Sequence, residues 1–121
     1  MGLSAYILYF FGGIKMLERD FQAKLIKELK ARFPGCVVLK NDANYIQGIP
    51  DLTVFYQNTW AMLEVKKDSS SKHQANQEVW VDKANNMSFA RFIFPENKEE
   101  VLNELERLFQ PERAACVSEP Q

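Results

Sequence analysis

The sequence predicts an α/β fold, a small mixed β-sheet flanked by helices with the element order α, β, β, β, α, β, α. Two observations predict it. Apolar residues recur at helical spacing in three segments, and between them lie short apolar runs of strand type, two of which flank a hairpin turn. A chain of 121 residues can bury one hydrophobic core, so we expect a single domain over residues 16–110.

The first predicted helix covers residues 17–33. An apolar residue occupies every fourth position from Leu17 to Phe33, and Pro34 and Gly35 end the pattern. A short apolar strand run follows at residues 36–39, and the polar segment 41–48 is predicted to be a loop.

The middle of the chain predicts a hairpin followed by a crossover. Two strand runs at residues 52–56 and 61–65 are separated by Gln57-Asn58-Thr59, a sequence typical of a hairpin turn. A polar connector, a second helix and a fourth strand are then expected at residues 67–72, 74–87 and 89–94.

The last predicted helix begins at Asn97. Glu100 follows three residues later, a spacing that predicts a capping box. The apolar side of this helix comprises Val101, Leu102, Leu105, Leu108 and Phe109. Beyond it, residues 111–121 are expected to form a disordered tail.

Residues 1–15 form an apolar N-terminal extension. Its first fourteen residues carry no charge, but they lack the basic start and small-residue cleavage site of a signal peptide. As a helix they would span only about 20 Å of a bilayer core of about 30 Å, so we expect no membrane anchor. An added strand, an oligomer contact and an upstream-start artefact remain open alternatives.

Composition restricts the chemistry more than it indicates a partner. The 15 basic and 16 acidic residues give a net charge of −1, without the basic excess typical of nucleic-acid binding. Cys36 and Cys116 are far apart and His73 is the only histidine, which excludes a zinc site of thiolates and imidazoles within one chain. We expect free thiols in the cytoplasm, no Gly-rich nucleotide loop, and a metal bound by oxygen ligands.

Three charged residues of the hairpin carry the strongest functional signal. Glu64 and Lys66 alternate onto one face of their strand, and Asp51 begins the partner strand. A two-residue turn would place Asp51 opposite Glu64, a four-residue loop would place it opposite Lys66, and an odd loop would separate them. Facing carboxylates repel, so this arrangement favours a divalent cation between them, Mg²⁺ or Mn²⁺.

The tetrapeptide Gly48-Ile49-Pro50-Asp51, followed by a strand, a turn and Leu63-Glu64-Val65-Lys66, resembles the PD-(D/E)xK nucleases and in particular the VRR-NUC (virus-type replication-repair nuclease) branch. The resemblance implies a restriction-endonuclease-like core and a Mg²⁺-dependent endodeoxyribonuclease, with residues 16–110 as the nuclease domain. Asp51, Glu64 and the backbone carbonyl of Val65 would hold the metal, with Mn²⁺ as a substitute. Lys66 would orient the attacking water or neutralise developing charge.

Two further positions match the resembling family. A helical wheel places Glu18 in the middle of the apolar arc of the first helix, facing the sheet, where Glu28 and Arg32 also fall. The family's glutamate at this place completes the metal site or its water network. Gln77 precedes Trp80 by three residues, and a glutamine at this interval reaches the active-site lysine or the substrate backbone in similar nucleases. Gln74 is the alternative, and His73 is expected at the surface.

The near-neutral net charge conceals an uneven distribution of charge along the chain. Residues 15–72 carry ten basic and seven acidic residues, a balance of +3, whereas residues 73–121 carry five and nine, a balance of −4. Lys24, Lys67 and Lys72 are the candidate phosphate contacts.

Small VRR-NUC-like proteins are associated with branched DNA such as the Holliday junctions of DNA recombination, and they act as homodimers. The resemblance therefore implies a structure-selective, junction-resolving homodimer in the cytoplasm of a prokaryotic or virus-infected cell. A general nicking or DNA-degrading endonuclease is the alternative enzyme. The alternative from another class is a catalytically silent nucleic-acid-binding module of the same fold.

Overall fold

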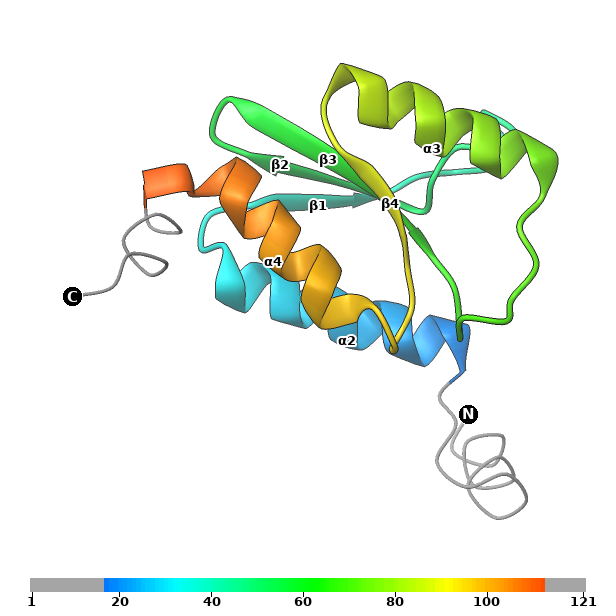
Figure 1. The fold of residues 1–121 in the computed structure, drawn as a ribbon, viewed down its shortest axis with the longest axis horizontal. Coiled ribbons are helices and arrows are strands. Elements are labelled where there is room, and N and C mark those ends of the chain that lie inside the picture. The colour runs from blue at the N-terminus through cyan, green and yellow to red at the C-terminus, as the bar shows by residue number, and fades with distance from the viewer. Residues whose placement is uncertain (1–16, 113–121) are drawn as a thin grey trace, which may run out of the picture.

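The computed structural model describes residues 17–112, and the predicted α/β class is confirmed (Figure 1). The elements, in chain order, are α2 (Glu18–Arg32), β1 (Val37–Lys40), β2 (Leu52–Tyr56), β3 (Thr59–Val65), α3 (Ala75–Met87), β4 (Ala90–Ile93) and α4 (Lys98–Phe109). The predicted extension 1–15 and residues 113–121 of the predicted tail lie outside the described residues.

The sheet has four strands in the order β1-β2-β3-β4 and is mixed, as predicted. β1, β2 and β3 are antiparallel neighbours, whereas β4 runs parallel to β3 because α3 carries the chain across between them. The ends of strands and helices differ from the predicted ends by at most two residues; β1 begins at Val37 rather than at Cys36.

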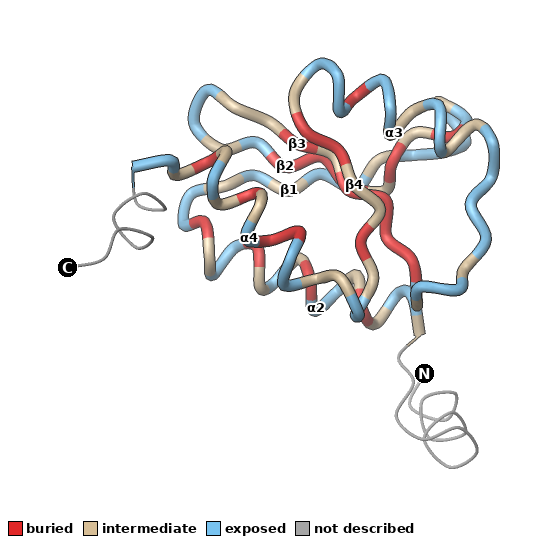
Figure 2. Tube along the Cα trace, in the orientation of Figure 1, coloured by how far each residue is buried: buried red, intermediate tan, exposed pale blue. Residues whose placement is uncertain are grey.

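The hydrophobic core lies between one face of the sheet and the pair α2 and α4. Leu52 pairs with Leu63 and Val54 with Ala61, so these four side chains share that face, and all are fully buried. Figure 2 shows the same burial as a red band through the central strands. The helices contribute Phe21, Leu25, Leu29, Phe33, Val101, Leu102, Leu105 and Phe109 to this core. α3 covers β3 and β4 from the opposite face (Figure 1).

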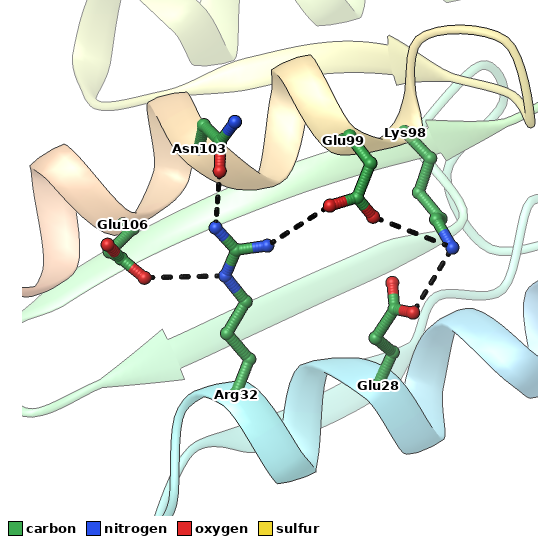
Figure 3. A network of polar contacts seen from close by, with 6 residues as sticks. All are labelled: Glu28, Arg32, Lys98, Glu99, Asn103 and Glu106. Carbon is green, nitrogen blue, oxygen red and sulfur yellow. Dashed lines mark hydrogen bonds and ion pairs between the residues drawn. The ribbon is translucent and has the colours of Figure 1, made fainter.

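A polar network joins α2 to α4 and explains two charges on the apolar arc of α2 (Figure 3). Arg32 Nε lies 3.4 Å from Glu106 Oε1, and its Nη2 donates to Asn103 Oδ1 at 2.5 Å. Lys98 Nζ lies 3.1 Å from Glu28 Oε1. These side chains therefore bridge the outer edges of two helices whose apolar sides enter the core.

The predicted capping box of α4 is wrong. Asn97 is the N-cap residue, but its side chain makes no cap hydrogen bond. Its Oδ1 instead accepts from the N–H of Phe94 at 2.8 Å, and its Nδ2 donates to the carbonyl of Phe92 at 3.0 Å. The amide thus supports the end of β4, and this tertiary contact takes precedence over local helix capping.

The outer face of β1 and β2 is not covered by α3 (Figure 1). Val37 pairs with Phe55 on this face, and Leu39 pairs with Thr53; the three apolar side chains are exposed. Among the described residues, no helix is both long and apolar enough to cross a membrane.

Candidate functional site

The β2–β3 hairpin places Asp51 opposite Glu64. The turn consists of Gln57 and Asn58 alone, because Tyr56 pairs with Thr59, and Gln57 has the positive φ of 53° that such a tight turn needs. Leu52 pairs with Leu63, so the preceding residue, Asp51, lies across from Glu64. Of the alternatives open at the sequence level, the two-residue turn is the one observed.

Backbone hydrogen bonds hold the two carboxylates in place. The N–H of Asp51 donates to Glu64 Oε1 at 3.2 Å, and the N–H of Val65 donates to Asp51 Oδ2 at 2.9 Å. Each carboxylate therefore accepts from the backbone of the opposite strand. Their positions depend on the strand register and not on flexible side-chain packing.

Lys66 and Gln77 complete a buried polar cluster with Glu64. Lys66 Nζ lies 3.5 Å from Glu64 Oε2 and donates to Gln77 Oε1 at 2.9 Å. Gln77 Nε2 donates to the same Glu64 Oε2 at 2.9 Å. Glu64 and Lys66 are only 3% and 8% exposed. Gln77 thus makes the predicted contact with Lys66, and its contact with Glu64 was not predicted; Gln74 is the N-cap residue of α3.

Burial raises the pKa of both carboxyl groups, and like charge adds to the shift of Glu64. Burial is the largest cause that raises the pKa of Glu64 to about 7, and the negative charge of Asp51 raises it further, against the opposing effect of Lys66. Burial also raises the pKa of Asp51, opposed first by the N–H of Val65 and then by Lys66. Two carboxylates this close repel each other, and a divalent cation between them would offset that repulsion.

Glu18 lies close to this cluster but is not buried against the sheet, contrary to the helical-wheel prediction. It is the first residue of α2 and is exposed. Its pKa is raised by partial desolvation and then by the charge of Asp51, and is lowered by Lys66 and Lys67. It makes no hydrogen bond or ion pair with the other described residues.

The loop before β2 is fixed at two points. Asn41 Nδ2 donates to the carbonyl of Pro50 and to Thr53 Oγ1, both at 2.8 Å, and the N–H of Asn41 donates to the carbonyl of Asp51 at 2.8 Å. Gly48 has a φ of +85°, and a Cβ there would lie 2.8 Å from the carbonyl oxygen of Asn76. The loop therefore connects Asp51 to the helix that carries Gln77.

Asn41 is the residue that the sequence analysis missed. It is a single polar residue after a strand, and its role appears only once the register pairs Lys40 with Leu52. The one signal available was its position as the first residue of the polar segment before Gly48-Ile49-Pro50-Asp51.

The surrounding cations and the histidine are placed at the surface. Lys24, Lys67 and Lys72 are exposed, and none of them makes an ion pair with the part of the chain that the structure describes. Lys67 is near enough to Glu18 to lower its pKa. The His73 ring stacks on Phe92, with centroids 3.7 Å apart, and Phe92 is the β4 partner of Glu64.

Within residues 17–112, no group of three or more histidine, cysteine, aspartate or glutamate side chains has the geometry of a metal site. The carboxylate pair at Asp51 and Glu64 is therefore the side-chain oxygen set on which a metal proposal can rest.

In comparisons with protein-family models, curated proteins and solved structures, the chain matches none of them.

Proposed function

We propose that this chain is a Mg²⁺-dependent endodeoxyribonuclease that hydrolyses phosphodiester bonds and is selective for branched DNA. The observation that carries the proposal is the convergence of Asp51, Glu64, Lys66 and Gln77 on one end of the hairpin, joined by four hydrogen bonds and one ion pair. A surface Glu-x-Lys pair without function would not require a buried glutamate and lysine beside a second, half-buried carboxylate.

The donor set fits Mg²⁺. This ion binds through one or two carboxylates and keeps several waters, so Asp51 and Glu64 suffice as side-chain ligands, with the carbonyl of Val65 as a third oxygen. Glu18, at the edge of the cluster, would contact its water shell. When bound, Mg²⁺ or Mn²⁺ polarises a phosphate and lowers the pKa of a bound water.

The protein's own groups supply position and charge. Lys66 presents a buried ammonium beside Glu64, where it orients a water and balances the negative charge that develops on the phosphate. The side-chain amide of Gln77 contacts both groups: its Oε1 accepts from the Lys66 ammonium, and its Nε2 donates to Glu64. Lys67, exposed near Glu18, and the more distant Lys24 and Lys72 would contact DNA phosphates.

Cleavage of supercoiled plasmid and of a synthetic four-way junction in Mg²⁺ tests the proposal. We expect nicking and junction cutting by the wild-type chain, and no cleavage after Asp51→Ala or Lys66→Ala in protein that remains folded by circular dichroism. Asp82→Ala is the matched control, because Asp82 is an exposed carboxylate on α3.

The result also separates the alternatives. Equal cutting of linear and four-way DNA would favour a general nicking or degrading endonuclease. Binding without cleavage in either Mg²⁺ or Mn²⁺ would favour the silent binding module. The proposed homodimer is tested independently by light scattering of the full chain, where a monomer would contradict it.

A further inference from the structure

Tyr45 is the most exposed large apolar side chain among residues 17–112. It is 85% exposed, and Val79 on α3 follows at 65%. Single exposed apolar residues are common on protein surfaces, so exposure alone does not indicate a binding site. More informative are the hydrogen-bonded turn that holds Tyr45 and the fact that Tyr45 and Val79 lie on elements that also carry site residues.

The backbone around Tyr45 is ordered by its own hydrogen bonds. The N–H groups of Tyr45 and Ile46 both donate to the carbonyl of Asp42, at 3.0 and 3.1 Å. The N–H of Asn44 donates to Asp42 Oδ1 at 2.8 Å. The ring is therefore presented to solvent from a fixed turn, and a ligand that meets it does not have to order the loop first.

Both exposed residues belong to elements that carry the site. The loop of Tyr45 ends at Asp51, where the carbonyl accepts from the N–H of Asn41. Gly48 of this loop lies against the backbone of Asn76 in α3. Asn76 directly precedes Gln77. Val79 follows Asn76 by three residues and therefore lies on the same side of α3 as the contact with Gly48. Asp51 is six positions after Tyr45 in the chain, which limits the distance between their Cα atoms to about 21 Å.

The chemistry of a tyrosine ring selects one part of a nucleic acid. Lysine side chains contact phosphates, whereas an aromatic ring can stack on the face of a base. Bases within a duplex are already stacked on their neighbours, so only an unpaired base has a free face. We propose that Tyr45 stacks on an unpaired base of the DNA beside the cleaved phosphate, with Val79 as an apolar neighbour. This inference rests on the proposed nuclease function, and narrows its substrate to DNA with an unpaired base near the cut.

The test measures stacking directly, in a chain that cannot cut. The full chain with Asp51→Asn, which retains an oxygen for the N–H of Val65, is mixed in Mg²⁺ with oligonucleotides that carry 2-aminopurine either in a duplex or in an unpaired position at a strand junction. We expect binding to quench the unpaired probe. Adding Tyr45→Ala removes the quenching and weakens binding to this DNA by about 5- to 100-fold, the value of one lost base–aromatic stack.

The controls and outcomes separate this inference from the proposed function. Tyr45→Phe retains the ring and should bind within about twofold of the parent, as should Met87→Ala, an exposed apolar residue at the other end of α3. Loss of affinity after Tyr45→Ala that is equal for paired and unpaired DNA, or no loss at all, overturns the stacking role and leaves the nuclease proposal standing. Failure of the Asp51→Asn chain to bind any DNA, together with no cleavage by wild type, overturns both.

Discussion

Asp51 and Glu64 face each other across the β2–β3 hairpin, and each accepts a hydrogen bond from a backbone N–H of the other's strand. The register that brings them together buries Glu64 and half-buries Asp51, so the fold itself creates the electrostatic cost of the pair. Lys66 offsets part of this cost through its ammonium, 3.5 Å from Glu64. The remaining cost gives a stability signature that can be measured without any substrate.

We predict that the metal-free chain loses stability as pH rises from about 4.5 to about 7. The pKa of Glu64 is raised to about 7, so the folded chain retains its proton over a range in which the unfolded chain has released it. Folding is therefore favoured below this window and loses that contribution across it, on the order of 3 kcal/mol. The free energy of unfolding in denaturant, measured in EDTA across this range, gives the profile.

Glu64→Gln removes the titrating group and provides the comparison. The free energy of unfolding of the wild type minus that of Glu64→Gln should fall as pH rises. At pH 7.5, saturating Mg²⁺ should raise the free energy of unfolding of the wild type but not that of the variant. A difference that is flat, or that rises with pH, would contradict the burial argument for Glu64.

Gln77→Ala should lower the cleavage rate, and it should also lower the free energy of unfolding by about 1–3 kcal/mol because Gln77 closes the capping box of α3 and donates to Glu64. The substitution removes the hydrogen bonds that hold both Lys66 Nζ and Glu64 Oε2, and residues that orient a metal ligand typically contribute 10- to 100-fold. Single-turnover cleavage with saturating enzyme measures the rate. Asn86→Ala, an exposed amide on the same helix, is the control and should cleave at the wild-type rate. An undiminished rate for Gln77→Ala would show that the amide does not position Lys66.

Gly48→Ala should destabilise the chain more than Gly35→Ala. Both glycines have a left-handed φ, of +85° and +90°, so alanine costs about 1 kcal/mol at each from the backbone alone. At Gly48 the new Cβ would also lie 2.8 Å from the carbonyl oxygen of Asn76, whereas at Gly35 it meets nothing within 4 Å. Urea denaturation compares the two, and equal losses would exclude a close approach between the loop and α3.

Part of this site is predictable from the sequence because local rules determine the positions of its residues. The hairpin register depends on alternation and turn length, so an even loop was enough to place Asp51, Glu64 and Lys66 on one face. Alternation and turn length are local rules, and the structure agrees with them. The contact of Gln77 with Lys66 was instead expected from the resemblance.

The failures at Asn97 and Asn41 come from contacts between separate elements, whereas the failure at Glu18 is local. The wheel placed Glu18 in the middle of the apolar arc, facing the sheet, but Glu18 is the first residue of the helix and is exposed, which agrees with the alternative of a helix-start acid favoured by the helix dipole. The capping box failed because the side chain of Asn97 bonds to β4 instead. Asn41 was missed because its partners, Pro50 and Thr53, become neighbours only through the pairing of β1 with β2.

Asn41→Ala tests whether that missed residue supports the site. Its amide donates to the carbonyl of Pro50 and to Thr53 Oγ1, and Thr53 is buried. Loss of the amide leaves both acceptors without this donor, at a cost of about 1–3 kcal/mol in the free energy of unfolding. Because Pro50 directly precedes Asp51, we also expect weaker Mg²⁺ binding, measured by titration calorimetry.

Asn44→Ala is the matched control for this substitution. Asn44 is an exposed asparagine of the same loop, and its hydrogen bond to Asp42 comes from the backbone N–H, which alanine retains. Its stability and Mg²⁺ affinity should equal those of the wild type. A double-mutant cycle of Asn41→Ala with Thr53→Ala should give a coupling energy of about 1 kcal/mol. Additive losses would mean that the Asn41 amide supports β2 through Pro50 alone.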